Sequence, residues 1–143
     1  MGTLKLRVVA LSTICAVALL GGCGGVDQGD QTACDLVANA MNTLNERIVN
    51  SSEASDVDKA EYRELVRAAN ADIAGQVTVA ITKANDAELL ESLTALLSLK
   101  ERYDIDSGNA DLGTAFFLQA STVELQCAAV GAAAEFKSAD DFR

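Results

Sequence analysis

The carboxylates, 21 against 11 basic residues, are the first candidates for chemistry in this sequence. Glu61 and Glu64 lie three residues apart, as do Glu88 and Glu91, so each pair falls on one face of a helix. Glu64 also precedes Arg67 by three residues, which is the spacing of an ordinary surface ion pair. We therefore expect solvated helix faces at these positions rather than paired catalytic acids.

No other set of residues predicts a catalytic, cofactor or metal site. The sequence has no histidine, which removes the commonest general base and the commonest metal ligand. The motifs of serine hydrolases, zinc proteases and phosphate-binding loops are absent as well. Residues 104–108 are acidic like a calcium loop, but the glycine and the final glutamate that an EF-hand requires are missing. We expect no catalytic residue, no metal and no cofactor.

The composition narrows the classes of fold and partner. The net charge is −10, whereas nucleic-acid binding depends on basic residues that neutralise phosphates, so we expect no nucleic-acid partner. Half of the residues are hydrophobic, only 4% are aromatic and none is proline. This composition predicts a packed core made from helices rather than a β-sandwich.

Residues 1–22 have the layout of an export signal. Lys5 and Arg7 precede an uncharged, mostly apolar run at residues 8–20, which is shorter than the roughly 20 residues that span a membrane. Residues 20–23, Leu-Gly-Gly-Cys, then resemble the lipobox of bacterial lipoproteins. The alternative is a buried apolar helix that happens to end in Gly-Gly-Cys.

The resemblance to bacterial lipoproteins implies that Cys23 becomes the first residue of the mature chain and carries a diacylglyceryl group, with acyl chains such as palmitate. Two acyl chains suffice for stable anchoring in a membrane. Residues 23–32 are then the lipidated cysteine and a flexible, Gly-rich tether. The resemblance implies a protein anchored by lipid at the extracytoplasmic face of the cell membrane.

This location also bears on the remaining cysteines. Cys15 leaves with the signal and Cys23 takes the lipid, so Cys34 and Cys127 remain in an oxidising compartment. We expect a disulfide between them, and two buried unpaired thiols are the alternative. The C-x-x-C spacing of a redox pair is absent, and nearby ligands for a metal are lacking.

Hydrophobic residues recur at helical spacing in four segments. We expect helices at residues 33–50, 55–84, 86–103 and 110–136, and a frayed tail at 138–143. Leucines surround much of the third helix, which we expect to be the most buried. The clearest stripes are Cys34, Val37, Met41, Leu44 and Ile48 in the first helix and Phe116, Ala120, Val123, Cys127, Val130 and Ala134 in the last.

The expected helix starts depend on capping residues. Thr32, Ser55 and Asn85 are each followed three residues later by an acidic residue, a pattern that favours a helix N-cap. Gly75 makes the second helix ambiguous, because glycine weakens helices and residues 77–81 also alternate like a strand. We expect an all-α protein whose second helix is kinked or broken near Gly75.

Amphipathic helices with short loops over residues 33–137 predict a four-helix up-down-up-down bundle. In that topology the start of the first helix meets the end of the last. Cys34 and Cys127 lie at those two ends and on the apolar stripes, so the expected disulfide and the expected topology agree.

The sequence therefore predicts a non-enzymatic surface lipoprotein whose helical domain binds another envelope protein. In size, lipobox and helicity it resembles small helical lipoproteins of actinobacteria and temperate phages. That resemblance implies superinfection exclusion, the blocking of phage DNA entry, as one alternative function. A carrier that holds a lipid or other apolar ligand between its helices is a second alternative. We expect Tyr62 and Tyr103 to be core residues rather than anchors for a partner.

Overall fold

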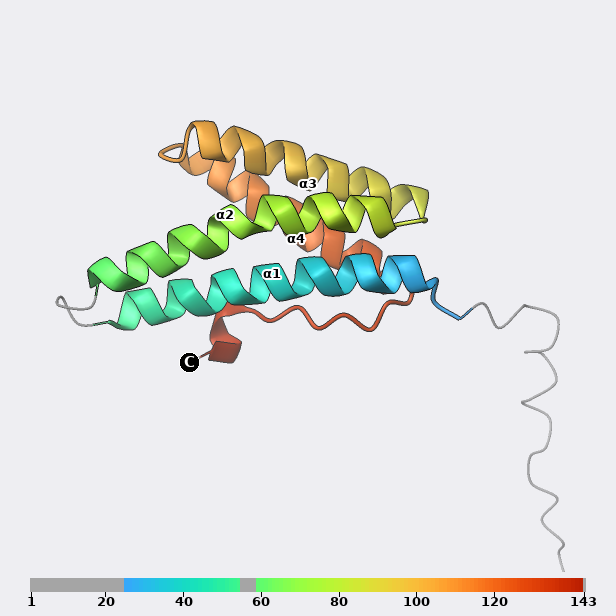
Figure 1. Ribbon diagram of the computed structural model, residues 1–143, viewed down its shortest axis with the longest axis horizontal. Coiled ribbons are helices and arrows are strands. Elements are labelled where there is room, and N and C mark those ends of the chain that lie inside the picture. Colours follow the sequence, from blue (N-terminus) through green and yellow to red (C-terminus); the bar gives the residue numbers. More distant parts are fainter. Residues whose placement is uncertain (1–24, 55–58, 143) are drawn as a thin grey trace, which may run out of the picture.

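The structure is a computed structural model that describes residues 25–54 and 59–142, and all its long elements are helices (Figure 1). They are α1 (Gln28–Glu53), α2 (Lys59–Lys83), α3 (Ala87–Ile105) and α4 (Ala110–Ala129), followed by a short 3-10 turn, η1 (Ala139–Phe142). Consecutive helices run in opposite directions, and the principal hairpins are α1 with α2 and α3 with α4. The predicted all-α, up-down-up-down bundle is confirmed for this part of the chain.

The core lies between these two hairpins. Its buried positions repeat every three or four residues, as the predicted stripes require. They include Cys34, Val37, Met41 and Leu44 on α1, Ile73, Val77 and Ala80 on α2, Leu89, Leu93 and Leu96 on α3, and Phe116, Ala120, Val123 and Cys127 on α4. Contrary to expectation, α1 buries more residues than α3, because α2, α4 and η1 all pack against α1.

Short polar side chains determine where α1, α3 and α4 begin. The caps are Asp27, Asp86 and Asn109, and each side chain accepts hydrogen bonds from two backbone N–H groups of the first turn. These donors have no partner within the helix itself. The predicted caps Thr32 and Asn85 are wrong: Thr32 lies inside α1, where its hydroxyl donates to the backbone oxygen four residues earlier, and Asn85 precedes the true cap.

The predicted tether is too long at its C-terminal side. Residues 28–32 are helical because Asp27 caps α1 ahead of them, so of the described chain only residues 25–27 precede the helix. The signal segment at 1–22 and the lipidation residue Cys23 lie outside the described residues. The predicted start of the second helix at Ser55 lies outside them too.

The α2 helix continues through Gly75 without a break. Gly75 is exposed and has open space around it, so it serves no turn or close approach. Val77 and Ala80 are fully buried, whereas Val79 is 44% exposed, which is helical rather than alternating burial. Of the predicted kink or break near Gly75, the break is therefore wrong, because the helical stripe outweighs the cost of one glycine, about 1 kcal/mol.

The α4 helix ends at Ala129, earlier than the predicted residue 136. Gly131 has a φ of +79°, a conformation that favours glycine. The backbone N–H of Ala132 then donates to the Cys127 oxygen (2.9 Å), and the N–H of Gly131 donates to the Ala128 oxygen (3.0 Å). This is the Schellman arrangement that ends helices. It redirects the chain although the alanines around it favour a helix.

Beyond this turn, residues 132–138 form an extended segment that we call the strap. The strap runs along α1 toward the C-terminal end of that helix (Figure 1). The following residues are ordered into η1, where the Asp141 carboxylate accepts hydrogen bonds from the backbone N (2.6 Å) and hydroxyl (2.9 Å) of Ser138. The predicted frayed tail at 138–143 is therefore wrong for residues 139–142, which pack on α1.

Candidate functional site

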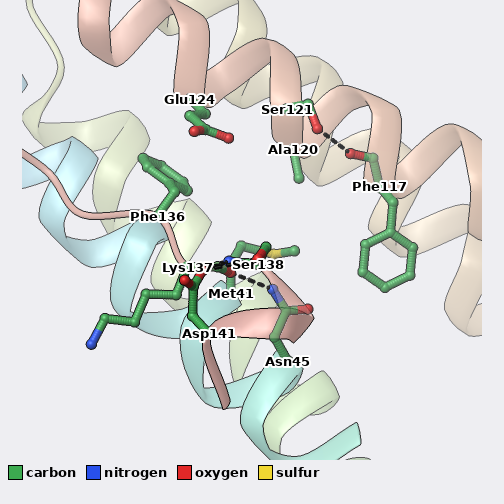
Figure 2. Close-up of a pocket in the computed structure, with 10 residues that line it drawn as sticks. All are labelled: Met41, Asn45, Phe117, Ala120, Ser121, Glu124, Phe136, Lys137, Ser138 and Asp141. Carbon is green, nitrogen blue, oxygen red and sulfur yellow. Dashed lines mark hydrogen bonds between the residues drawn. The ribbon is translucent and has the colours of Figure 1, made fainter. Parts of the chain in front are cut away.

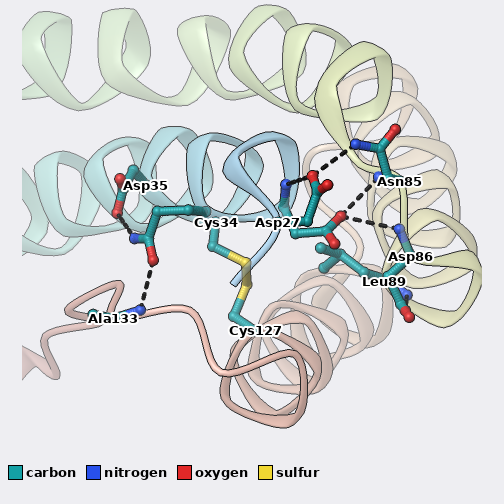
Figure 3. Close-up of a disulfide and its surroundings, with 10 residues drawn as sticks. Asp27, Cys34, Asp35, Asn85, Asp86, Leu89, Cys127 and Ala133 are labelled. Atoms are coloured by element: carbon teal, nitrogen blue, oxygen red, sulfur yellow. Dashed lines mark hydrogen bonds between the residues drawn. A yellow bond between two sulfur atoms is a disulfide. The ribbon is translucent and has the colours of Figure 1, made fainter. Parts of the chain in front are cut away.

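Cys34 and Cys127 form a disulfide that joins the start of α1 to the end of α4 (Figure 3). Both residues are buried, and their Cα atoms are 5.7 Å apart. The disulfide expected from the sequence is thus present, and the alternative of two unpaired thiols is not. We call this end of the bundle, where the chain enters α1, the tied end.

A second connection at the tied end joins α1 to the loop between α2 and α3. The Asp30 side chain is 5% exposed, and its Oδ1 accepts hydrogen bonds from the backbone N–H groups of Asn85 (2.7 Å) and Asp86 (3.0 Å). Oδ1 of Asp27 accepts from Nδ2 of Asn85 (2.7 Å) (Figure 3). A Cβ at Gly29 would overlap the backbone oxygen of Lys83, so the close approach requires glycine.

These hydrogen bonds perturb one carboxyl group at the tied end. The side chain of Asn85 and the backbone N–H groups of Gly29 and Asp30 hold the pKa of Asp27 below its ordinary value of 3.8. Both Asp27 and Asp30 are occupied by donors of the chain itself. They act as structural acceptors, and their arrangement offers no acid–base pair for catalysis.

Amide side chains of α1 hold the strap in place. Gln31 Oε1 accepts from the backbone N of Ala133 (2.9 Å). Farther along α1, Asn42 bonds the backbone on both sides of Phe136, and Asn45 Nδ2 donates to the Lys137 oxygen (2.9 Å). Within the strap, the half-buried Ala132, Ala134 and Phe136 alternate with the exposed Ala133 and Glu135. The strap therefore covers α1 as a single extended chain.

A cavity of about 310 Å³ lies beneath the strap, between α1 and α4 (Figure 2). Figure 2 shows Phe117 of α4 and Phe136 of the strap on different walls of this cavity. Glu124 and Asp141 also line it, together with Lys137. Its lining is thus of mixed charge, with carboxylates on two sides.

A second cavity of about 310 Å³, which we call the groove, lies farther from the disulfide. All four helices line it, because the α1–α2 hairpin diverges from the α3–α4 hairpin toward this end of the bundle (Figure 1). Its lining residues are Leu44, Ile48, Arg63, Val66, Arg67, Asn70, Tyr103, Gly113, Phe116 and Phe117. The disulfide thus connects the helices at one end of the bundle, and the groove lies near the other end.

The carboxylate pairs noted in the sequence do not gather into a site. Glu61, Glu64, Glu88 and Glu91 are exposed on α2 and α3, and Glu64 forms the expected ion pair with Arg67 (2.5 Å). Their interpretation as solvated helix faces is confirmed.

The acidic side chains of residues 104–108, the segment that resembles a calcium loop, bond to other residues of the chain. Lys100 is fully buried, and its Nζ contacts both carboxylate oxygens of Asp104 (2.5 and 2.6 Å). Asp106 accepts a hydrogen bond from Asn109. Within residues 25–54 and 59–142, no three potential ligands are close enough to hold a metal ion.

The buried Lys100 and the amides that hold the strap were not predicted from the sequence. Lys100 lies four residues after Leu96 and so continues the leucine stripe of α3, while Asp104 follows at ion-pair spacing. That combination of positions could have predicted the pair. The strap amides carry no comparable signal, because their partners are backbone atoms of a segment that was expected to be helical.

The two tyrosines are half-buried. Tyr103 stacks on Phe116, with 6.5 Å between the ring centroids, and it also lines the groove. It is therefore part of the core edge, as expected, while its ring remains available to the cavity.

One face of α4 is exposed although it is apolar. Leu118 is 66% exposed and Leu125 is 70% exposed, and these residues lie two helical turns apart. Thr122 lies between them on the same side, and Ala129 continues the series. We call these four residues the α4 face. Between residues 112 and 129, Glu124 is the only charged residue.

Comparison with protein-family models, curated proteins and solved structures found no match to this chain. Among the helices that the structure describes, none is long and apolar enough to cross a membrane.

Proposed function

We propose that the protein is a lipid-anchored, non-enzymatic bacterial lipoprotein whose helical domain binds another envelope protein. The anchor is proposed from the resemblance of residues 20–23 to a lipobox. The disulfide between Cys34 and Cys127 supports export, because such bonds persist in oxidising compartments. Asp27 and Asp30 accept hydrogen bonds from the chain itself, and the paired glutamates of α2 and α3 are exposed, which supports a binding role over catalysis.

The observation that carries the binding proposal is the exposure of Leu118 and Leu125 on the α4 face. Exposed apolar side chains that form one contiguous patch mark interaction sites more often than single exposed ones do. The disulfide fixes the C-terminal end of α4 to α1, so the face is held in place before it meets a partner.

The position of the anchor supports the same proposal. The described chain begins at Gly25, close in sequence to Cys23, and enters α1 at the tied end. The α4 face therefore starts near the proposed anchor and extends away along the bundle. Confinement at one membrane raises the effective concentration of a partner in that membrane, so a small apolar face is sufficient.

Affinity capture from detergent-solubilised membranes tests this proposal, with the intact protein as bait. We expect a specific envelope protein to be captured by the wild type and lost with Leu118→Ser/Leu125→Ser. Ile105→Ser is the matched control, because Ile105 is an aliphatic residue of α3 that is 88% exposed. Equal capture by the wild type and the α4 variant would count against this surface.

A further inference from the structure

We propose that the groove binds a single-chain amphiphile with an anionic head group, such as a fatty acid. Neither Leu118 nor Leu125 lines this site, so the inference goes beyond the proposed protein-binding function and does not depend on it. Residues near the end opposite the disulfide line the groove. At that end the two helix hairpins diverge (Figure 1).

The inner wall of the groove is apolar. Leu44 and Phe116 are nearly fully buried in the core and form part of the lining. Ile48 and Phe117 are 38% and 43% exposed at the margin, so the site is accessible from outside. The volume of about 310 Å³ lies at the lower limit for small-molecule sites and suits one acyl chain rather than two.

The outer wall of the groove is cationic. Arg63, Arg67 and Asn70 follow one another on α2 at steps of four and three residues, which places them on one face of that helix. Arg67 forms an ion pair with Glu64 at the surface. Arg63 has no ion-pair partner among the described residues. Of the described residues that line the groove, none carries a carboxylate.

Charge determines the class of ligand. The chain has a net charge of −10, so two guanidinium groups beside an apolar cavity are opposite in sign to the protein as a whole. A guanidinium donates paired hydrogen bonds to a carboxylate or phosphate, and Asn70 adds a neutral donor. The cavity beneath the strap has the same volume, but two carboxylates, Glu124 and Asp141, line it against one cation, Lys137, so it is less suited to an anion.

A photoreactive fatty acid provides the test. Its chain carries a diazirine, and its control has the same chain with a trimethylammonium head in place of the carboxylate. The full-length protein, held in phosphatidylcholine nanodiscs, is titrated with each probe and cross-linked peptides are located by mass spectrometry. We expect the carboxylate probe to label peptides that contain Ile48 or Val66, which line the groove and not the cavity beneath the strap, and to be displaced by unlabelled palmitate.

The variants separate a head-group site from unspecific partitioning. We expect Arg63→Gln/Arg67→Gln to weaken labelling by about 10- to 100-fold in apparent affinity, as expected for lost charge-assisted hydrogen bonds. Arg102→Gln, an exposed arginine of α3 that does not line the groove, leaves labelling unchanged.

Equal labelling by both head groups, insensitivity to the arginine double variant, or labels confined to the strap cavity would overturn the proposal. If a co-purifying protein blocks labelling of the groove, the groove is a binding site for a protein partner, and the fatty-acid proposal is overturned as well. Because Leu118 and Leu125 are intact throughout, failure here leaves the capture experiment unaffected.

Discussion

The carboxylate of Asp30 accepts a hydrogen bond of 2.7 Å from the backbone N–H of Asn85, which links the first turn of α1 to the loop between α2 and α3. The neighbouring Asp86 N–H donates to the same oxygen. Close by, the disulfide joins α1 to α4. These contacts concentrate the cross-links of the bundle at the end where the chain enters it.

Asp30→Ala leaves two backbone N–H groups of the α2–α3 loop without an acceptor in a part-buried site. We expect the free energy of unfolding to fall by about 1–3 kcal/mol, as measured by chemical denaturation. Asp35→Ala is the control, because Asp35 is exposed and, among the described residues, its carboxylate accepts a hydrogen bond only from the Gln31 side chain. A loss at position 30 no larger than at position 35 would mean that the link contributes nothing.

The pKa of Asp27 is lowered mainly by its hydrogen bond from Asn85. A carboxyl group with a depressed pKa in the folded state stabilises the fold above its unfolded pKa, ordinarily 3.8, and this contribution is lost as the pH falls through the folded value. We expect Asn85→Ala to raise the pKa of Asp27 toward 3.8 in an NMR titration. An unchanged pKa in that variant would show that the backbone donors alone are responsible.

Removal of the disulfide relaxes a large loop in the unfolded chain. Cys34 and Cys127 are 93 residues apart, and the chain-entropy model then gives a loss of about 4–5 kcal/mol for Cys34→Ala/Cys127→Ala. Chemical denaturation with and without reductant measures this. The wild type should lose stability on reduction, whereas the double variant should not respond, and a wild type indifferent to reductant would refute the expectation.

Two glycines are expected to respond in opposite directions to alanine. Gly131→Ala forces a Cβ into a conformation with φ of +79°, and we expect a loss of about 1–2 kcal/mol. Gly75→Ala, in an exposed helix interior, is expected to stabilise by about 0.5–1 kcal/mol. Thermal or chemical unfolding measures both changes. A stabilising Gly131→Ala would mean that α4 extends beyond Ala129 in solution.

The sequence was informative where burial repeats at helical spacing. Val37, Met41 and Leu44, and likewise Phe116, Ala120 and Val123, are buried as their stripes predict. Helix ends were harder to predict because several residues compete for the same role. Asp27 and Thr32 are each followed by an acidic residue three positions later, and the structure uses Asp27, which also bonds Asn85 across the bundle.

The candidate binding surfaces were less accessible to sequence analysis. The groove exists because the two helix hairpins diverge. The angle between the hairpins cannot be predicted from the identity of lining residues such as Leu44, Arg63 or Phe116. The strap was missed because the alanines after Cys127 favour a helix, while Gly131 alone redirects the chain. At the strap, the turn at Gly131 and the hydrogen bonds to α1 outweigh the helix propensity of the alanines, whereas the groove depends on how distant segments pack.

The intact mass of the protein purified from membranes tests the proposed anchoring most directly. We expect a chain that begins at Cys23, carries a diacylglyceryl increment and loses two hydrogens to the disulfide between Cys34 and Cys127. A chain that still begins at Met1 and lacks any acyl increment would contradict the account, because the helical domain would then have no lipid anchor.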